Sequence, residues 1–168
     1  VMDIQDPRHV TKVLNTYLYT DGCPEFMNLI YDLDDWRDRK IDNPENHFLY
    51  RVLRDRTGSC ARLPVFYLAI AHRLGLPCSL VSTPDHCFVR YDDGKIKFNI
   101  ETTTAFRTNP RTGEKYKIFG YDQWDEEIIE DLQIPRTTVE TGAYLKSLSR
   151  KEAVSELLGG PPQVFMQR

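Results

Sequence analysis

The front third of the chain has the apolar spacing of helices. Hydrophobic residues recur three or four positions apart in three stretches, which is the periodicity of an α-helix. The three sets are Val10, Val13, Leu14 and Tyr17; Phe26, Leu29, Ile30 and Leu33; and Phe48, Leu49, Val52 and Leu53. Asp6-Pro7 and Asn43-Pro44 precede the first and third sets in the form of helix N-termini, and Pro24 precedes the second. Residues 1–57 are therefore expected to be mainly helical.

The centre of the chain changes to one strongly apolar stretch followed by short alternating runs. Residues 61–74 predict a helix that ends at Gly75. Pro64 falls in the first turn of this helix, where a missing N–H costs least. Strands are expected next, at residues 78–82, 87–91 and 97–101. Asp92-Asp93-Gly94 has the composition of a hairpin turn between the last two.

The last part of the chain is less regular. Residues 103–114 are polar and contain turn pairs, so a loop is expected there. The elements expected after it are a strand at residues 116–119, an acidic helix at 124–132 and a closing helix at 149–158. The chain thus predicts one domain, divided into a helical part (1–57), a core (58–120) and C-terminal helices with a tail (121–168).

Composition narrows the classes of protein that remain. The 168 residues are 40% hydrophobic and 28% charged, which suits one globular domain. The formal net charge is −3, and the basic residues are interleaved with acids, so nucleic-acid binding is not expected. No apolar stretch approaches the roughly 20 residues that cross a bilayer, so no membrane span is expected either.

The four cysteines bear on compartment and metal binding. They are Cys23, Cys60, Cys78 and Cys87, and no two of them form a CxxC pair. Neither a zinc ribbon nor a disulfide scaffold is expected, and reduced thiols favour a cytoplasmic location. The first residues do not read as a signal peptide. Both ends of the chain are compatible with a longer parent polypeptide from which a signal was removed.

Candidate chemistry gathers around Cys60, at the start of the expected apolar helix. A helix N-terminus stabilises negative charge, and the thiolate is the nucleophilic form of cysteine. The small residues Gly58 and Ser59 before it would let a substrate approach the sulfur. Cys78 and Cys87 lie in expected strands and are interpreted as core residues, and Cys23 lies in a turn.

Two further residues complete a candidate triad. Side chains alternate between the two faces of a strand, so His86, Phe88 and Arg90 share one face and Cys87 lies on the other. On the next strand of the hairpin, Asn99 and Glu101 share a face. An imidazole that takes the thiol proton, oriented by a carboxylate, is the arrangement of an activated cysteine nucleophile.

At these residues the sequence resembles the transglutaminase-like superfamily. Residues 56–60 (RTGSC) and 68–77 (LAIAHRLGLP) resemble its nucleophile helix, residues 86–90 (HCFVR) its histidine strand and residues 98–103 (FNIETT) its acidic strand. More narrowly, residues 43–54 and 140–148 are similar to bacterial transglutaminase-like proteins. The resemblance covers about two-thirds of the chain and is most specific from Asn43 to Thr103.

The resemblance implies an α+β, papain-like fold, with N-terminal helices and a nucleophile-bearing helix packed on a small antiparallel sheet. It implies a catalytic Cys60, His86 and Glu101, acting on a peptide, protein or glutamine side chain without metal or cofactor. The family acid is usually Asp, so Asn99 is kept as an alternative third member. The backbone N–H of Cys60 and the side chain of Asn46 are candidate oxyanion donors.

Three functions fit this pattern. The first is hydrolysis, deamidation or cross-linking through a thioester on Cys60, with hydrolysis favoured. The second is a catalytically degenerate domain that binds a peptide or protein, which the Glu-for-Asp change would favour. The third is acyl transfer from a thioester donor, as arylamine acetyltransferases do on a related fold.

Overall fold

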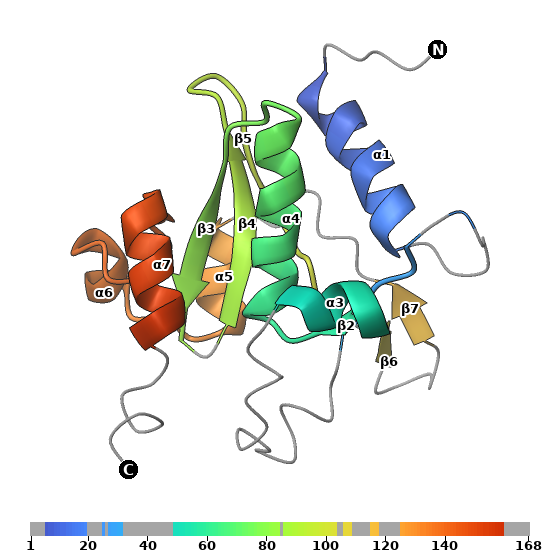
Figure 1. Ribbon diagram of the computed structural model, residues 1–168. Helices are drawn as coiled ribbons and strands as arrows, with labels where there is room; N and C mark the ends of the chain where they lie inside the picture. Colours follow the sequence, from blue (N-terminus) through green and yellow to red (C-terminus); the bar gives the residue numbers. More distant parts are fainter. Residues whose placement is uncertain are drawn as a thin grey trace.

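The computed structural model (Figure 1) describes residues 6–19, 25, 27–31, 49–84, 86–103, 106–108, 115–117 and 125–159. Its elements, in chain order, are α1 (Pro7–Tyr19), β1 (Ile30–Tyr31), α3 (Leu49–Asp55), β2 (Thr57–Gly58), α4 (Arg62–Arg73), β3 (Cys78–Thr83), β4 (His86–Asp92), β5 (Lys97–Ile100), β6 (Phe106–Thr108), β7 (Lys115–Lys117), α5 (Asp125–Asp131), α6 (Arg136–Glu140), β8 (Ser147–Leu148) and α7 (Arg150–Gly159).

The main sheet has four strands in the order β5-β4-β3-β8, and all neighbouring pairs are antiparallel. Helix α4 lies along one face of β3 and β4, and α5 lies behind them on the other face (Figure 1). Helices packed on a small antiparallel sheet make this an α+β structure, as the sequence predicted.

Two apolar clusters hold the helices to the two faces of the sheet. The larger cluster joins α4 to Val89 and Tyr91 of β4 and to Leu14 and Leu18 of α1. The smaller one joins Phe88 to buried isoleucines of α5. Neighbouring residues of β4 therefore enter different cores, which confirms the alternation predicted for residues 87–91.

Helix α4 begins at Arg62, and a hydrogen-bonded turn that contains Cys60 leads into it. The carbonyl of Ser59 accepts hydrogen bonds from the N–H groups of Arg62 and Leu63, at 3.1 and 3.0 Å. Cys60 and Ala61 therefore sit inside the first turn, and Pro64 follows at a position that does not need its N–H. At the other end the helix stops at Gly75, whose φ of 73° suits glycine. The predicted helix at 61–74 is confirmed to within a residue or two.

The turn between β4 and β5 is closed by aspartate side chains. Asp93 Oδ1 accepts the N–H groups of Lys95 and Ile96, at 2.8 and 2.7 Å. Asp92 Oδ1 accepts the N–H of Gly94 at 2.9 Å, and Gly94 has a φ of 82°. The predicted hairpin is confirmed, and its register places Arg90 opposite Asn99.

Helix α1 is confirmed, but its apolar spacing did not identify its buried face. Val13 and Tyr17 are 48% and 45% exposed, whereas Thr11 and Leu18 are completely buried. Thr11 can be buried because its hydroxyl donates a hydrogen bond to the carbonyl of Pro7 at 2.9 Å. The buried face of α1 therefore includes a polar side chain with a hydrogen-bond partner as well as hydrophobic side chains.

Two stretches differ in type from the prediction. Ile30 and Tyr31 form a strand and not a helix, and Ile30 pairs in parallel with Thr57. A short apolar run fits either element, and the partner strand decides between them. Residues 106–108, expected to be loop, form β6 and pair with β7. The strand predicted at 116–119 overlaps β7 at residues 116 and 117, and residues 118 and 119 lie outside the described residues.

Helices at the C-terminal end follow the prediction more closely. The acidic helix at 124–132 corresponds to α5, and the closing helix at 149–158 corresponds to α7. Ser149 and Glu152 cap α7 reciprocally: Ser149 N–H donates to Glu152 Oε2 at 2.9 Å, and Glu152 N–H donates to Ser149 Oγ at 3.3 Å. Neither α6 nor β8 was expected. Among the described residues, no helix is both long and apolar enough to span a bilayer.

Candidate active site

Cys60 lies in the first turn of α4, just after the short strand β2. Its free thiol is half-buried. Gly58, two residues earlier, is buried, and a Cβ there would meet Leu63 at 3.0 Å and Val52 at 3.2 Å. The small size of Gly58 therefore serves the packing of β2 against α3 and α4. This packing role was not expected from the sequence.

His86 begins strand β4, at the end of the sheet nearest the start of α4. Its side chain is 25% exposed, and its backbone carbonyl accepts a hydrogen bond from the hydroxyl of Thr83 at 3.1 Å. The imidazole hydrogen-bonds to the Glu101 carboxylate, and the neighbouring Cys60 side chain contributes to its raised pKa. Nε2 is 2.7 Å from Glu101 Oε2, so Nδ1 is the ring nitrogen that this contact leaves open.

Glu101 follows the last residue of β5 and is 16% exposed. One carboxylate oxygen, Oε2, faces His86, and the other, Oε1, accepts two hydrogen bonds from Thr103. The Thr103 N–H lies 2.8 Å from Oε1, and the Thr103 hydroxyl lies 2.6 Å from it. Glutamate is one methylene longer than aspartate, and from this position its carboxylate contacts the imidazole.

The charges of this pair stabilise each other. Burial lowers the pKa of His86, but hydrogen bonds to Cys60 and Glu101 outweigh it and raise the pKa to about 10. Burial raises the pKa of Glu101, but the imidazolium and the two donors of Thr103 leave it below its usual range. Both shifts favour the charged forms of the pair, an imidazolium on His86 and a carboxylate on Glu101.

Asn99, the alternative third member, lies elsewhere on the same face. Its amide nitrogen donates to Asp125 Oδ1 at 2.9 Å, and its amide oxygen accepts a hydrogen bond from Arg90 Nε at 2.9 Å. Arg90 is 3% exposed and also bonds to Asp125 and to the carbonyl of Leu145. Asn99 therefore belongs to a buried network that ties α5 to the sheet, and the group that contacts the imidazole is Glu101.

The other candidates are placed as follows. Cys87 packs against the larger core, on the α4 face of the sheet, and burial is the main cause that raises its pKa to about 12. Cys78 is buried, and its pKa is also raised to about 12 by burial. Asn46 and Cys23 lie outside the described residues. Within the described part of the chain, no cluster of three or more His, Cys, Asp or Glu side chains could hold a metal ion.

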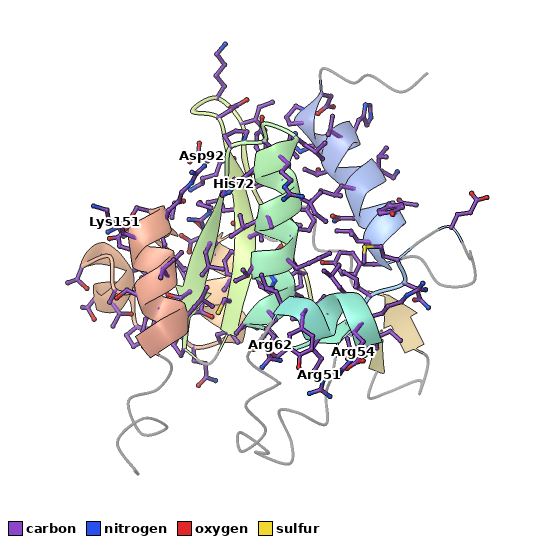
Figure 2. All side chains as sticks on the ribbon, in the orientation of Figure 1. Arg51, Arg54, Arg62, His72, Asp92 and Lys151 are labelled. Atoms are coloured by element: carbon purple, nitrogen blue, oxygen red, sulfur yellow. The ribbon has the colours of Figure 1, made fainter. Side chains whose placement is uncertain are left out.

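A cleft of about 430 Å³ lies at the other end of α4. Its walls come from the C-terminal part of α4, from β3, and from the start of α7, and they include Leu68, His72 and Arg150. Figure 2 shows His72 at the upper end of α4 and Arg62, two residues after Cys60 in sequence, at its lower end. The cleft is therefore separate from the residues around Cys60.

Comparison with protein families supports what the geometry suggests. A family model described as the transglutaminase-like superfamily matches residues 3–153. The chain belongs to the transglutaminase-like superfamily. Comparison with curated proteins and with solved structures found no match. Family membership agrees with the α+β fold and with cysteine-based acyl chemistry.

Sequence reasoning missed Thr103 and the network around Arg90. Thr103 carries a signal, because a threonine two positions after an acidic residue can donate both its N–H and its hydroxyl back to that carboxylate. The partner of Arg90 carried no such local signal. Asp125 is 35 positions away along the chain and meets Arg90 only after α5 has packed on the sheet.

Proposed function

We propose that this protein is a cysteine acyl-transfer enzyme that attacks amide carbonyls of peptide or glutamine side-chain substrates. The observation that carries the proposal is the contact of His86 with Glu101 at 2.7 Å, together with the neighbouring Cys60, whose side chain helps to raise the pKa of the imidazole. A nucleophile, a base and a group that orients the base are the three parts of such a site. Superfamily membership independently favours the same chemistry.

In the first half-reaction the Cys60 thiolate attacks the substrate carbonyl. A C–S bond forms, and the carbonyl electron pair moves onto oxygen. As this intermediate collapses, the C–N bond breaks and the leaving amine takes the Nδ1 proton of the His86 imidazolium. The products are a thioester on Cys60, a neutral His86 and free amine or ammonia. Glu101 keeps the ring oriented and stabilises its positive charge before the proton leaves.

The developing oxyanion needs hydrogen-bond donors. The backbone N–H of Cys60 is suited to this role, because it lies in the first turn of α4. Among the residues that the structure describes, none accepts a hydrogen bond from it. The dipole of α4 adds favourable potential at the same point. Asn46 as a second donor stays a prediction.

In the second half-reaction an acceptor resolves the thioester. With water, neutral His86 takes one proton as the water oxygen bonds to the thioester carbonyl carbon. The C–S bond then breaks, the carboxylic acid product leaves, and the thiolate and imidazolium are restored. With an amine acceptor the same steps give a new amide. We favour hydrolysis, since transfer requires a water-poor channel for a second substrate.

The alternative of a degenerate binding domain is less well supported. Its main argument was the longer acid at position 101, and that carboxylate lies within hydrogen-bond distance of the imidazole.

The proposal is tested by replacing the nucleophile and a matched cysteine. Parent, Cys60→Ser and Cys87→Ala proteins are incubated with casein and with a protected glutaminyl peptide, with and without a primary amine. Peptide release, ammonia release and amine incorporation distinguish hydrolysis, deamidation and transfer. Acetyl-coenzyme A with an arylamine tests transfer from a thioester donor. We expect turnover in at least one assay for the parent and for Cys87→Ala, and none for Cys60→Ser. Retained turnover in Cys60→Ser would exclude the mechanism.

A further inference from the structure

A glutamate used to orient an imidazole needs something to fix its extra rotatable bond. An additional side-chain torsion adds conformational freedom that must be lost when the carboxylate is aligned. At position 101 the sheet ends one residue earlier, at Ile100, so strand packing does not hold the carboxylate. The contacts that fix it come from the chain immediately after.

Thr103 supplies both of these contacts to a single oxygen. Its N–H and its hydroxyl lie 2.8 and 2.6 Å from Glu101 Oε1. A carboxylate only accepts hydrogen bonds, so the hydroxyl proton of Thr103 is committed to Glu101. Thr103 is itself 8% exposed, and water competes little for the hydroxyl.

The two carboxylate oxygens of Glu101 therefore have different partners. With Oε1 held by two donors, the orientation of the carboxylate plane is fixed and Oε2 is left facing His86 Nε2, at 2.7 Å. Without the hydroxyl, Oε1 keeps only the backbone donor, and the carboxylate can rotate about its last torsion. The contact with the imidazole would then be made for a smaller fraction of the time.

We propose that Thr103 is a positioning residue of the active site, which clamps Glu101 Oε1 so that Oε2 stays on the imidazole of His86. This inference rests on the proposed function, and it adds a residue that acts through the carboxylate without contacting substrate. It also explains how glutamate can serve where aspartate is usual, because the clamp compensates for the longer side chain.

Thr102 offers a matched control for the experiment. It is the preceding threonine, it is completely buried, and its hydroxyl has no hydrogen-bond partner among the described residues. Replacing either threonine by valine removes a buried hydroxyl and preserves the branched shape. The two variants therefore differ mainly in the bond to Glu101. Thr103→Ser restores that hydroxyl in a smaller side chain.

The test combines a titration with a reactivity profile in Thr103→Val, Thr103→Ser, Thr102→Val and the parent. The pKa of His86 is measured by NMR of the imidazole nitrogens, and alkylation of Cys60 by iodoacetamide is followed by mass spectrometry from pH 5 to 9. In Thr103→Val we expect the pKa of His86 to fall by about one unit and alkylation at pH 6 to slow by about tenfold. We expect Thr103→Ser and Thr102→Val to resemble the parent.

Each outcome bears on a different claim. If folded Thr103→Val titrates and reacts like the parent, Thr103 is not a positioning residue. If Thr102→Val shows the same loss, the effect comes from packing and the inference is also overturned. If Cys60 is unreactive in the parent, the proposed enzyme fails, yet the His86 titration in Thr103→Val still decides whether the clamp positions the carboxylate.

Discussion

Glu101→Gln removes one charge from the site and keeps the shape of the side chain. The amide oxygen of Gln can still accept both donors of Thr103, so the amide NH₂ is the group turned toward His86 Nε2. An amide NH₂ is a donor, and it favours a neutral ring nitrogen that accepts. The substitution therefore exchanges a partner of the imidazolium for a partner of the neutral imidazole.

The size of the expected change in the pKa of His86 follows from its contact with Glu101. An opposite charge in contact with an ionisable group shifts its pKa by about 1–3 units, and the raised pKa of His86 depends on both Cys60 and Glu101. We expect the pKa of His86 to fall from about 10 by about 1–3 units in Glu101→Gln. At about 1.4 kcal/mol per unit, the free energy of unfolding at pH 6 should drop by about 1.5–4 kcal/mol.

The pH dependence has a definite sign. The pKa of His86 is raised from 6.5 to about 10 in the folded state, so its stabilisation is fully present below pH 6.5 and is lost as pH rises through 10. The difference in unfolding free energy between parent and Glu101→Gln should therefore be large at pH 6 and shrink toward pH 10. Imidazole NMR and urea denaturation at both pH values measure the two quantities.

A matched control removes a different glutamate. Glu152 forms an exposed ion pair with Lys146 at 2.6 Å, and exposed pairs contribute little to stability. Glu152→Gln should leave the titration of His86 unchanged. The reasoning would be refuted if Glu101→Gln also left that titration unchanged, or if its destabilisation were the same at pH 6 and pH 10.

Two predictions concern the scaffold around the site. Asp125→Asn removes the charged partner of buried Arg90. The free energy of unfolding, measured in urea, should fall by about 2–3 kcal/mol. A loss below about 0.5 kcal/mol would contradict a structural role for this pair. Gly58→Ala places a Cβ 3.0 Å from Leu63 and should cost about 1–3 kcal/mol in the same measurement, whereas a neutral effect would show that β2 can shift freely.

Local patterns in the sequence were enough to predict the centre of the fold. The apolar run of α4, the alternation along β4 and the Asp-Asp-Gly turn each depend on a few neighbouring residues, and each is present in the structure. The same local logic brought Cys60, His86 and Glu101 close together, since a helix start and two paired strands limit where their side chains can lie.

What the sequence did not reveal depends on partners far along the chain. Ile30 is a strand residue only because Thr57 pairs with it, and the exposed side of α1 follows from how Leu14 and Leu18 meet the core. Asn99 shares a face with Glu101, so alternation alone left both as candidates for the third member. The contact of Glu101 with His86, and the position of Asp125, which reaches Asn99 from α5, distinguish them.

The most direct test of the central claim is the pH dependence of Cys60 alkylation in the parent and in His86→Ala. An ordinary thiol, with a pKa of about 8.5, reacts slowly at pH 6. The account predicts rapid alkylation of Cys60 at pH 6 in the parent, and a loss of at least tenfold at that pH in His86→Ala. If Cys60 reacts like an ordinary thiol in both proteins, the two residues do not form an activated pair, and the proposed enzyme is excluded.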